Sequence, residues 1–163
     1  AAPFTPTETN MQTSWLLGGA TAWSRNIIDT HPHPINFSTK WAVCEDLIYS
    51  YPLAREYRLM VAADANAYHN ETYSEMSFRQ GMFYGVSGAI MRYHFVCQSP
   101  DLKTWAYMWM TIGVILGNFG KGLFSSPRHL GLCLGGVVGL MRTITCSLIN
   151  GDSTRLVKAL NNR

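Results

Sequence analysis

Two arginines and a histidine lie inside apolar stretches of the sequence, where a charged side chain is costly. Arg92 and His94 lie near the end of one stretch, and Arg142 lies inside another. An arginine at the centre of a membrane costs about 2.5 to 3.5 kcal/mol on insertion scales. These residues could line a path for an ion or a polypeptide, or each could pair with a polar partner. Arg92 could instead snorkel toward the polar turn that begins at Gln98.

A pathway for protons would need an acidic side chain within the apolar stretches. The apolar stretches contain no Asp or Glu to complete a proton relay, and Asn118 is their main uncharged polar residue. Arg142 lies too far from the end of its stretch, at Asn150, to snorkel easily. We therefore expect Arg142 to face a polar partner, a lipid headgroup or another subunit, and we favour structural pairing over a pathway.

The residues that usually carry catalysis or bind metals are scattered. His31 and His33 alternate with prolines, and no further ligand follows them at a zinc-site spacing. The sequence has no HExxH or GxSxG motif and no phosphate-binding glycine loop. No CxxC pair occurs among the four cysteines, Cys44, Cys97, Cys133 and Cys146. We therefore predict a protein that is not an enzyme and has no catalytic residues, metal ligands or cofactor, although bound phospholipid is compatible with the sequence.

Three apolar stretches must position these residues: Gly81–Cys97, Thr104–Gly120 and Leu130–Asn150. Short polar turns containing Pro100 and Pro127 separate them, so consecutive stretches would be antiparallel. Each stretch approaches the roughly 20 residues that a helix needs to cross hydrocarbon. The alternating polarity typical of strands does not occur in them. The pattern therefore predicts three membrane-spanning helices.

Small residues recur four positions apart in all three stretches, and this step returns to nearly the same face of a helix. In water, glycine at this density would cost about 1 kcal/mol per position. In lipid, small residues let two helix backbones approach closely and so promote association. The predicted packing residues are Gly81, Gly85, Ala89, Gly113, Gly117, Gly131, Gly135 and Gly139. The expected fold is an all-α membrane protein of three to four transmembrane helices with GxxxG packing, plus amphipathic helices outside the membrane.

The other parts of the chain flank the predicted bundle of residues 81–150. Residues 1–13 are expected to form an extended N-terminus. Residues 14–28 are apolar only over their first part, so a short helix there either crosses the membrane or lies on it. Residues 29–80 are expected to form an extramembrane linker with amphipathic helices. Residues 151–163 are expected to form a surface tail with a short helix.

Within the region before the bundle, Pro52 separates two predicted helices. Apolar residues recur at helical spacing from Leu53 to Tyr68, opposite charged residues such as Arg55 and Asp64. This pattern predicts an amphipathic helix that lies on the membrane or packs on a partner.

Aromatic and basic residues mark the predicted membrane boundaries. Trp105 and Trp109 open the middle stretch, and Lys121 and Arg128 lie around the second turn. The expected contacts with lipid or partner subunits are Arg92, Arg142, Trp105, Trp109, Lys121 and Arg128. Basic residues are equally frequent on the two predicted sides of the membrane. The positive-inside rule therefore leaves the orientation of the chain in the membrane open.

The composition is consistent with a chain that lies partly in a membrane. Charged residues make up 14% of the 163 residues, compared with about 25% in soluble domains, and the mean hydropathy is near zero. The net charge of +3 comes from basic residues that are spread singly along the chain. Because nucleic-acid binding needs a concentrated basic stripe, we exclude a nucleic-acid partner.

Five glycine-rich or turn segments together carry a family resemblance: LGGATA at 17–22, GVSGAI at 85–90, SPDLKTW at 99–105, GVILGNFGKG at 113–122 and LGGVVGLMR at 134–142. In these segments the chain resembles the four-helix channel family of the mitochondrial inner-membrane translocase. It also resembles a relative of that family, the four-helix accessory subunit of respiratory complex I. The connection between the first and second spans is longer here, and no acidic residue lies within a span. These departures weigh against translocation more than against an accessory role.

The resemblance implies a multi-pass protein of the mitochondrial inner membrane that belongs to an oxidative-phosphorylation assembly. We expect a non-catalytic accessory subunit that stabilises a respiratory-chain complex, with complex I, the electron-transport enzyme NADH:ubiquinone oxidoreductase, as the first choice. Its partners would be other subunits and phospholipid. The alternatives are a component of an inner-membrane protein translocase or transporter, a subunit of another oxidative-phosphorylation complex, and a small membrane enzyme.

Overall fold

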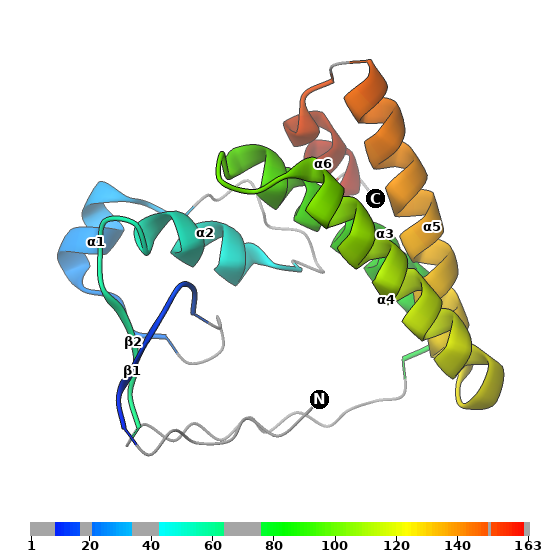
Figure 1. The fold of residues 1–163 in the computed structure, drawn as a ribbon, viewed down its shortest axis with the longest axis horizontal. Coiled ribbons are helices and arrows are strands. Elements are labelled where there is room, and N and C mark those ends of the chain that lie inside the picture. Colours follow the sequence, from blue (N-terminus) through cyan, green and yellow to red (C-terminus); the bar gives the residue numbers. More distant parts are fainter. Residues whose placement is uncertain (1–8, 17–20, 34–42, 64–75, 150, 162–163) are drawn as a thin grey trace. The chain divides into compact units, whose positions relative to one another are not determined.

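The computed structural model describes residues 9–16, 21–33, 43–63, 76–149 and 151–161. Six helices contain 69% of these residues. The helices are α1 (Arg25–Thr30), α2 (Glu45–Leu53), α3 (Phe78–Gln98), α4 (Thr104–Phe124), α5 (Pro127–Leu148) and α6 (Ser153–Asn161), and the strands are β1 (Met11–Thr13) and β2 (Leu59–Val61) (Figure 1). The chain divides into two units: the first holds α1, α2 and both strands, and the second holds α3 to α6.

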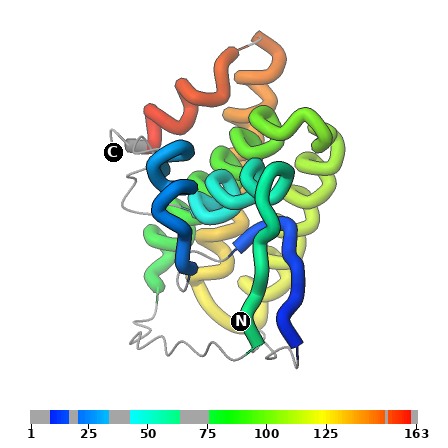
Figure 2. The backbone as a smooth tube through the Cα atoms, turned by 90° about the vertical axis from the view of Figure 1, so that its left-hand side faces the viewer, coloured from blue at the N-terminus to red at the C-terminus, as the bar shows by residue number. Residues whose placement is uncertain are grey.

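The first unit is built on a small antiparallel sheet. Strand β1 pairs with β2, with Met11 opposite Val61 (Figure 2). The hydroxyl of Tyr49 on α2 donates a hydrogen bond of 2.8 Å to the carbonyl oxygen of His31, just after α1. The ring of Tyr49 also packs edge-on against Trp23, with the centroids 5.1 Å apart. These contacts hold the two short helices of this unit together.

The helix predicted over residues 14–28 is wrong for the part of that segment that the structure describes. Residues 14–16 are not helical, residues 17–20 lie outside the described residues, and α1 begins only at Arg25. With six residues, α1 is far shorter than the roughly 20 residues that cross a bilayer. Ser24 has an extended backbone conformation and is the N-cap of α1, so the helix cannot begin before Arg25.

The amphipathic helix predicted after Pro52 is also wrong over the described residues. Helix α2 contains Pro52 in its last turn and ends at Leu53, and β2 then occupies Leu59–Val61. Leu59 is buried whereas Met60 is exposed, which is the alternation of a strand. The helical pattern would bury Met60, but pairing of this segment with β1 turns Leu59 inward and leaves Met60 exposed. Residues 64–75 of the predicted helix lie outside the described residues.

The long helices of the second unit begin at strong local signals. The hydroxyl of Ser77 accepts the backbone N–H of Gln80, whose side chain in turn accepts the backbone N–H of Ser77. This capping box starts α3. Helix α5 begins with Ser126 as its N-cap and Pro127 in its first turn, where proline needs no hydrogen-bond donor.

The core of the second unit lies between α3, α4 and α5. Tyr93, Tyr107 and Cys146 form its centre, one from each helix. Helix α6 packs on α3 and α5 and buries Val157 and Leu160. The tail predicted over residues 151–163 is therefore a helix that packs on the bundle, at least as far as residue 160.

Among the described residues, only α5 is long and apolar enough to cross a membrane. The expectation of three to four transmembrane helices is therefore not supported by the length and hydropathy of the described helices. Helix α3 carries Arg92 and His94, and α4 carries Asn118 and Lys121 together with weakly hydrophobic aromatic residues. These residues lower the mean hydropathy of α3 and α4, although both helices are as long as the prediction required.

Candidate functional site

Helices α3 and α5 pack backbone against backbone through glycine. A Cβ on Gly131 would collide with the carbonyl oxygen of Phe78 and would lie 2.9 Å from the nitrogen of Met82. A Cβ on Gly135 would collide with the carbonyl oxygen of Met82 and would lie 3.0 Å from the Cα of Gly85. Nothing larger than a hydrogen atom fits at these two positions.

The close contact between α3 and α5, which we call the glycine interface, extends beyond Gly131 and Gly135 in both directions. A Cβ on Gly81 would collide with the carbonyl oxygen of Arg128, and a Cβ on Gly139 would lie 2.7 Å from the Cβ of Ala89. The order of these pairs shows that α3 and α5 run in the same direction. The glycine interface therefore brings together all the packing residues predicted on α3 and α5, Gly81, Gly85, Ala89, Gly131, Gly135 and Gly139.

The two packing glycines predicted on α4 are placed differently. Among the described residues, nothing outside the local helix backbone lies within 4 Å of a Cβ on Gly113 or Gly117, so their assignment to helix packing is wrong for this part of the chain. Helix α4 instead meets α5 through Ile115, whose Cγ1 would lie 2.8 Å from a Cβ on Gly136. Sequence reasoning missed Gly136, although its position next to Gly135 places it on a second face of α5.

Helices α4 and α5 each present a stripe of large apolar side chains away from the bundle. Trp109 is 69% exposed, Leu116 is 63% exposed, and Leu148 is 79% exposed. We call these rows the outer stripes, and their residues are Trp105, Trp109, Leu116, Phe119 and Leu123 on α4 and Leu134, Val137, Met141, Ile144 and Leu148 on α5. The spacing of three, four or seven residues keeps each row on one helix face.

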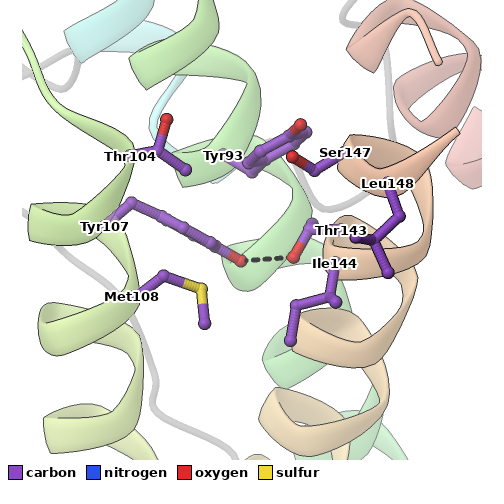
Figure 3. A pocket seen from close by; sticks show the side chains of 8 residues that line it. All are labelled: Tyr93, Thr104, Tyr107, Met108, Thr143, Ile144, Ser147 and Leu148. Carbon is purple, nitrogen blue, oxygen red and sulfur yellow. Dashed lines mark hydrogen bonds between the residues drawn. The ribbon is translucent and has the colours of Figure 1, made fainter. Parts of the chain in front are cut away.

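The polar bonds between helices lie inside the bundle. Thr143 donates its hydroxyl to the carbonyl oxygen of Leu140, at 2.8 Å, so it must accept the hydroxyl of Tyr107, at 2.9 Å. Figure 3 shows Tyr107 on α4 and Thr143 on α5 pointing toward each other. They line an apolar cavity of about 200 Å³ together with Tyr93 of α3. The cavity holds no charged side chain, and we assign the Tyr107 bond a structural role.

Asn118 is hydrogen-bonded through both atoms of its amide. Its Nδ2 donates to the carbonyl oxygen of Val114 at 2.8 Å, and its Oδ1 lies 3.0 Å from Nδ1 of His129. The second bond links α4 to the first turns of α5. Asn118 therefore connects two helices.

His94 is paired with a serine that sequence reasoning did not single out. A hydrogen bond of 3.0 Å joins its Nδ1 to the Oγ of Ser153, at the start of α6. A serine beside a histidine is the arrangement of an activated nucleophile. Ser153 is only 5% exposed, however, and neither residue lines either cavity described here. The bond ties α6 to α3, and a separation of 59 residues hides it from the sequence.

Asp152 caps α6, and this contact predicts a local dependence on pH. The backbone N–H of Thr154 donates to Oδ1 of Asp152 at 2.8 Å, and this bond lowers the pKa of the carboxyl group. The stabilisation is therefore present above the ordinary pKa of aspartate, about 3.9, and is lost as the pH falls through the lowered pKa. We expect hydrogen exchange of the Thr154 amide, corrected for its intrinsic rate, to lose protection there.

Asp152→Asn is the matched control for this prediction. Asparagine is an equally good N-cap but does not titrate, so the protection of the Thr154 amide should no longer fall with pH. An equal fall in both proteins would show that another group controls the end of α6.

The arginines in the apolar helices are half-buried and lie in different surroundings. Arg92 lines a cavity of about 250 Å³ between α3, α4 and α5, which we call the Arg92 cavity. Neither His94 nor Arg142 lines it, so these three residues do not share one cavity. Lys121 and Arg128 are exposed at the end of α4 and the start of α5.

The histidines of the first unit contact neighbouring side chains. Nε2 of His31 lies 3.7 Å from a carboxylate oxygen of Glu56, and the ring of His33 lies 4.7 Å from that of Tyr49. In the part of the chain that the structure describes, no three His, Cys, Asp or Glu side chains come together as a metal site would require.

Comparison of the chain with protein-family models, curated proteins and solved structures finds no match.

Proposed function

We propose that this chain is a non-catalytic accessory subunit that stabilises a multisubunit membrane complex. The two faces of α5 carry this proposal. One face is closed by backbone contact with α3, and the opposite face presents large apolar side chains. Only 39% of the apolar segment of α5 is buried within the chain, whereas the core helix of a soluble protein would be mostly covered.

The bundle of α3, α4 and α5 would enter the membrane as one body. Helix α3 contacts α5 from Gly131 to Gly139, and α4 contacts it from His129 to Thr143. A bilayer that surrounds α5 therefore also surrounds its two neighbours. In this arrangement α3 and α4 are further transmembrane segments, held in the membrane by packing in addition to their own hydropathy.

Complex I of the mitochondrial inner membrane is our first choice of assembly. The support for this choice is the resemblance of the glycine-rich segments to its four-helix accessory subunit. The outer stripes would contact lipid or neighbouring subunits, as would Trp105, Trp109, Lys121 and Arg128. A component of a protein translocase is the second candidate, because the same segments resemble that family, and a subunit of another oxidative-phosphorylation complex is the third.

Native electrophoresis of gently solubilised membranes tests this function. The tagged full-length chain is expected to migrate with a respiratory complex of megadalton size and to coincide with NADH dehydrogenase activity in the gel. Migration with a small import complex would support the translocase alternative instead. Coincidence with a different respiratory activity would favour the third candidate, and migration as a free monomer would contradict an accessory role.

A further inference from the structure

A charged side chain lines a cavity between three helices of the second unit. Arg92 of α3 and Thr111 of α4 both line the Arg92 cavity. Arg92 is half-buried, and no described carboxylate forms an ion pair with it. A half-buried guanidinium needs other hydrogen-bond acceptors when it has no carboxylate beside it. A cavity against such a group therefore suits an anionic ligand.

The guanidinium of Arg92 is directed into the bundle. A Cβ on Gly88 would lie only 3.5 Å from Nη1 of Arg92. The guanidinium therefore lies one helical turn back along α3, as expected from the tilt of helical side chains toward the N-terminus. This direction leads away from the polar turn at Gln98, so Arg92 does not snorkel toward it. No described carboxylate lies within 4.0 Å of this guanidinium.

The remaining walls of the cavity are mainly apolar. Val114 and Ile115 of α4 and Leu132 of α5 contribute to them. Val114 is also exposed on the surface of α4, so the apolar wall reaches the outside of the bundle. The volume of about 250 Å³ lies below the roughly 300 to 1,000 Å³ of sites that enclose a whole small molecule. The cavity therefore suits a headgroup whose apolar chains leave it.

We propose that the Arg92 cavity binds a phosphate oxyanion, supplied by the headgroup of a phospholipid. A guanidinium can donate two parallel N–H bonds to phosphate oxygens. The acyl chains run out along Val114 and the apolar surface of α4. This inference rests on the proposed membrane position of the bundle, but it does not depend on which complex the chain joins.

Native mass spectrometry of the delipidated full-length chain in detergent tests the proposal. The probes are dioleoyl phosphatidylglycerol, dioleoylglycerol, which has the same chains without phosphate, and inorganic phosphate. We expect saturable binding of phosphatidylglycerol and no saturable binding of dioleoylglycerol. Arg92→Gln should weaken phosphatidylglycerol binding by about tenfold or more, because it removes the charge-assisted bonds.

Two further variants make the result specific to the cavity. Arg92→Lys keeps the positive charge but cannot donate two parallel bonds, so it should bind phosphatidylglycerol more weakly than the parent chain and more tightly than Arg92→Gln. Arg79→Gln removes an exposed arginine of the same helix that does not line the cavity, and it should leave the affinity unchanged.

The remaining outcomes identify the source of the phosphate or overturn the site. Inorganic phosphate that binds alone and depends on Arg92 would support the oxyanion site and assign it to free phosphate. Equal binding of dioleoylglycerol would overturn the proposal, as would equal losses in Arg92→Gln and Arg79→Gln. Loss of membership in a respiratory complex, with binding of the lipid intact, would contradict the proposed function alone.

Discussion

Gly135→Ala is expected to destabilise the bundle by at least about 3 kcal/mol, the upper end of the cost of overpacking a core. The added methyl group would collide with the carbonyl oxygen of Met82 and would lie 3.0 Å from the Cα of Gly85. Both neighbours are backbone atoms, so relief requires α3 and α5 to move apart. Unfolding of the purified chain in mixed micelles, followed by circular dichroism against denaturing detergent, measures the loss.

Gly113→Ala is the matched control for this substitution. It makes the same chemical change in the adjacent helix, where nothing outside the local backbone lies within 4 Å of the new methyl group. Alanine is the better helix former by about 1 kcal/mol, so this variant should be as stable as the parent or slightly more stable. Equal destabilisation by both substitutions would contradict the assignment of close packing to the contact between α3 and α5.

Leu116→Lys is expected to reduce the amount of the chain that is integrated in the membrane and incorporated into a complex. Leu116 lies near the middle of α4 and is 63% exposed. In hydrocarbon, a lysine at the centre of a helix costs about 2.5 to 3.5 kcal/mol. At a water-exposed site the same change would alter stability by no more than about 0.5 kcal/mol. Resistance to alkaline extraction and the intensity of the native gel band measure the difference.

Gln98→Lys supplies the comparison for this prediction. It introduces the same charge at an exposed position, but at the end of α3, where a lysine can reach polar surroundings. We expect it to behave like the parent chain. Full membrane integration and normal assembly of Leu116→Lys would contradict the burial of the α4 outer stripe in lipid or against a neighbouring subunit.

The long helices were predictable because local chemistry sets their limits. The sequence predicts apolar segments at residues 81–97, 104–120 and 130–150, and the helices span 78–98, 104–124 and 127–148. Ser77 caps α3, and Ser126 with Pro127 starts α5, through neighbours in the chain, so the starts of these two helices can be read without tertiary contacts. The N-terminal half lacks such strong signals, and there the structure has a short α1 and a strand where the sequence predicts longer helices.

The tertiary structure decided which of the predicted site residues act together. The four-residue spacing of glycine occurs in all three segments, but only α3 and α5 use it against each other. Gly113 and Gly117 show the same spacing, but a Cβ on either would meet no described atom within 4 Å outside the local helix backbone. Spacing defines a face of a helix, whereas the choice of neighbour depends on how all the helices pack.

By itself, the sequence determined that three long apolar helices form and that arginines lie within them, because hydropathy and capping act locally. It could not determine where those arginines point or which polar groups meet. His94 bonds to Ser153 across 59 residues, and Arg92 shares a cavity with Thr111. Only the packing of separate helices brings such residues together, and this packing turns an isolated arginine into a candidate ligand site.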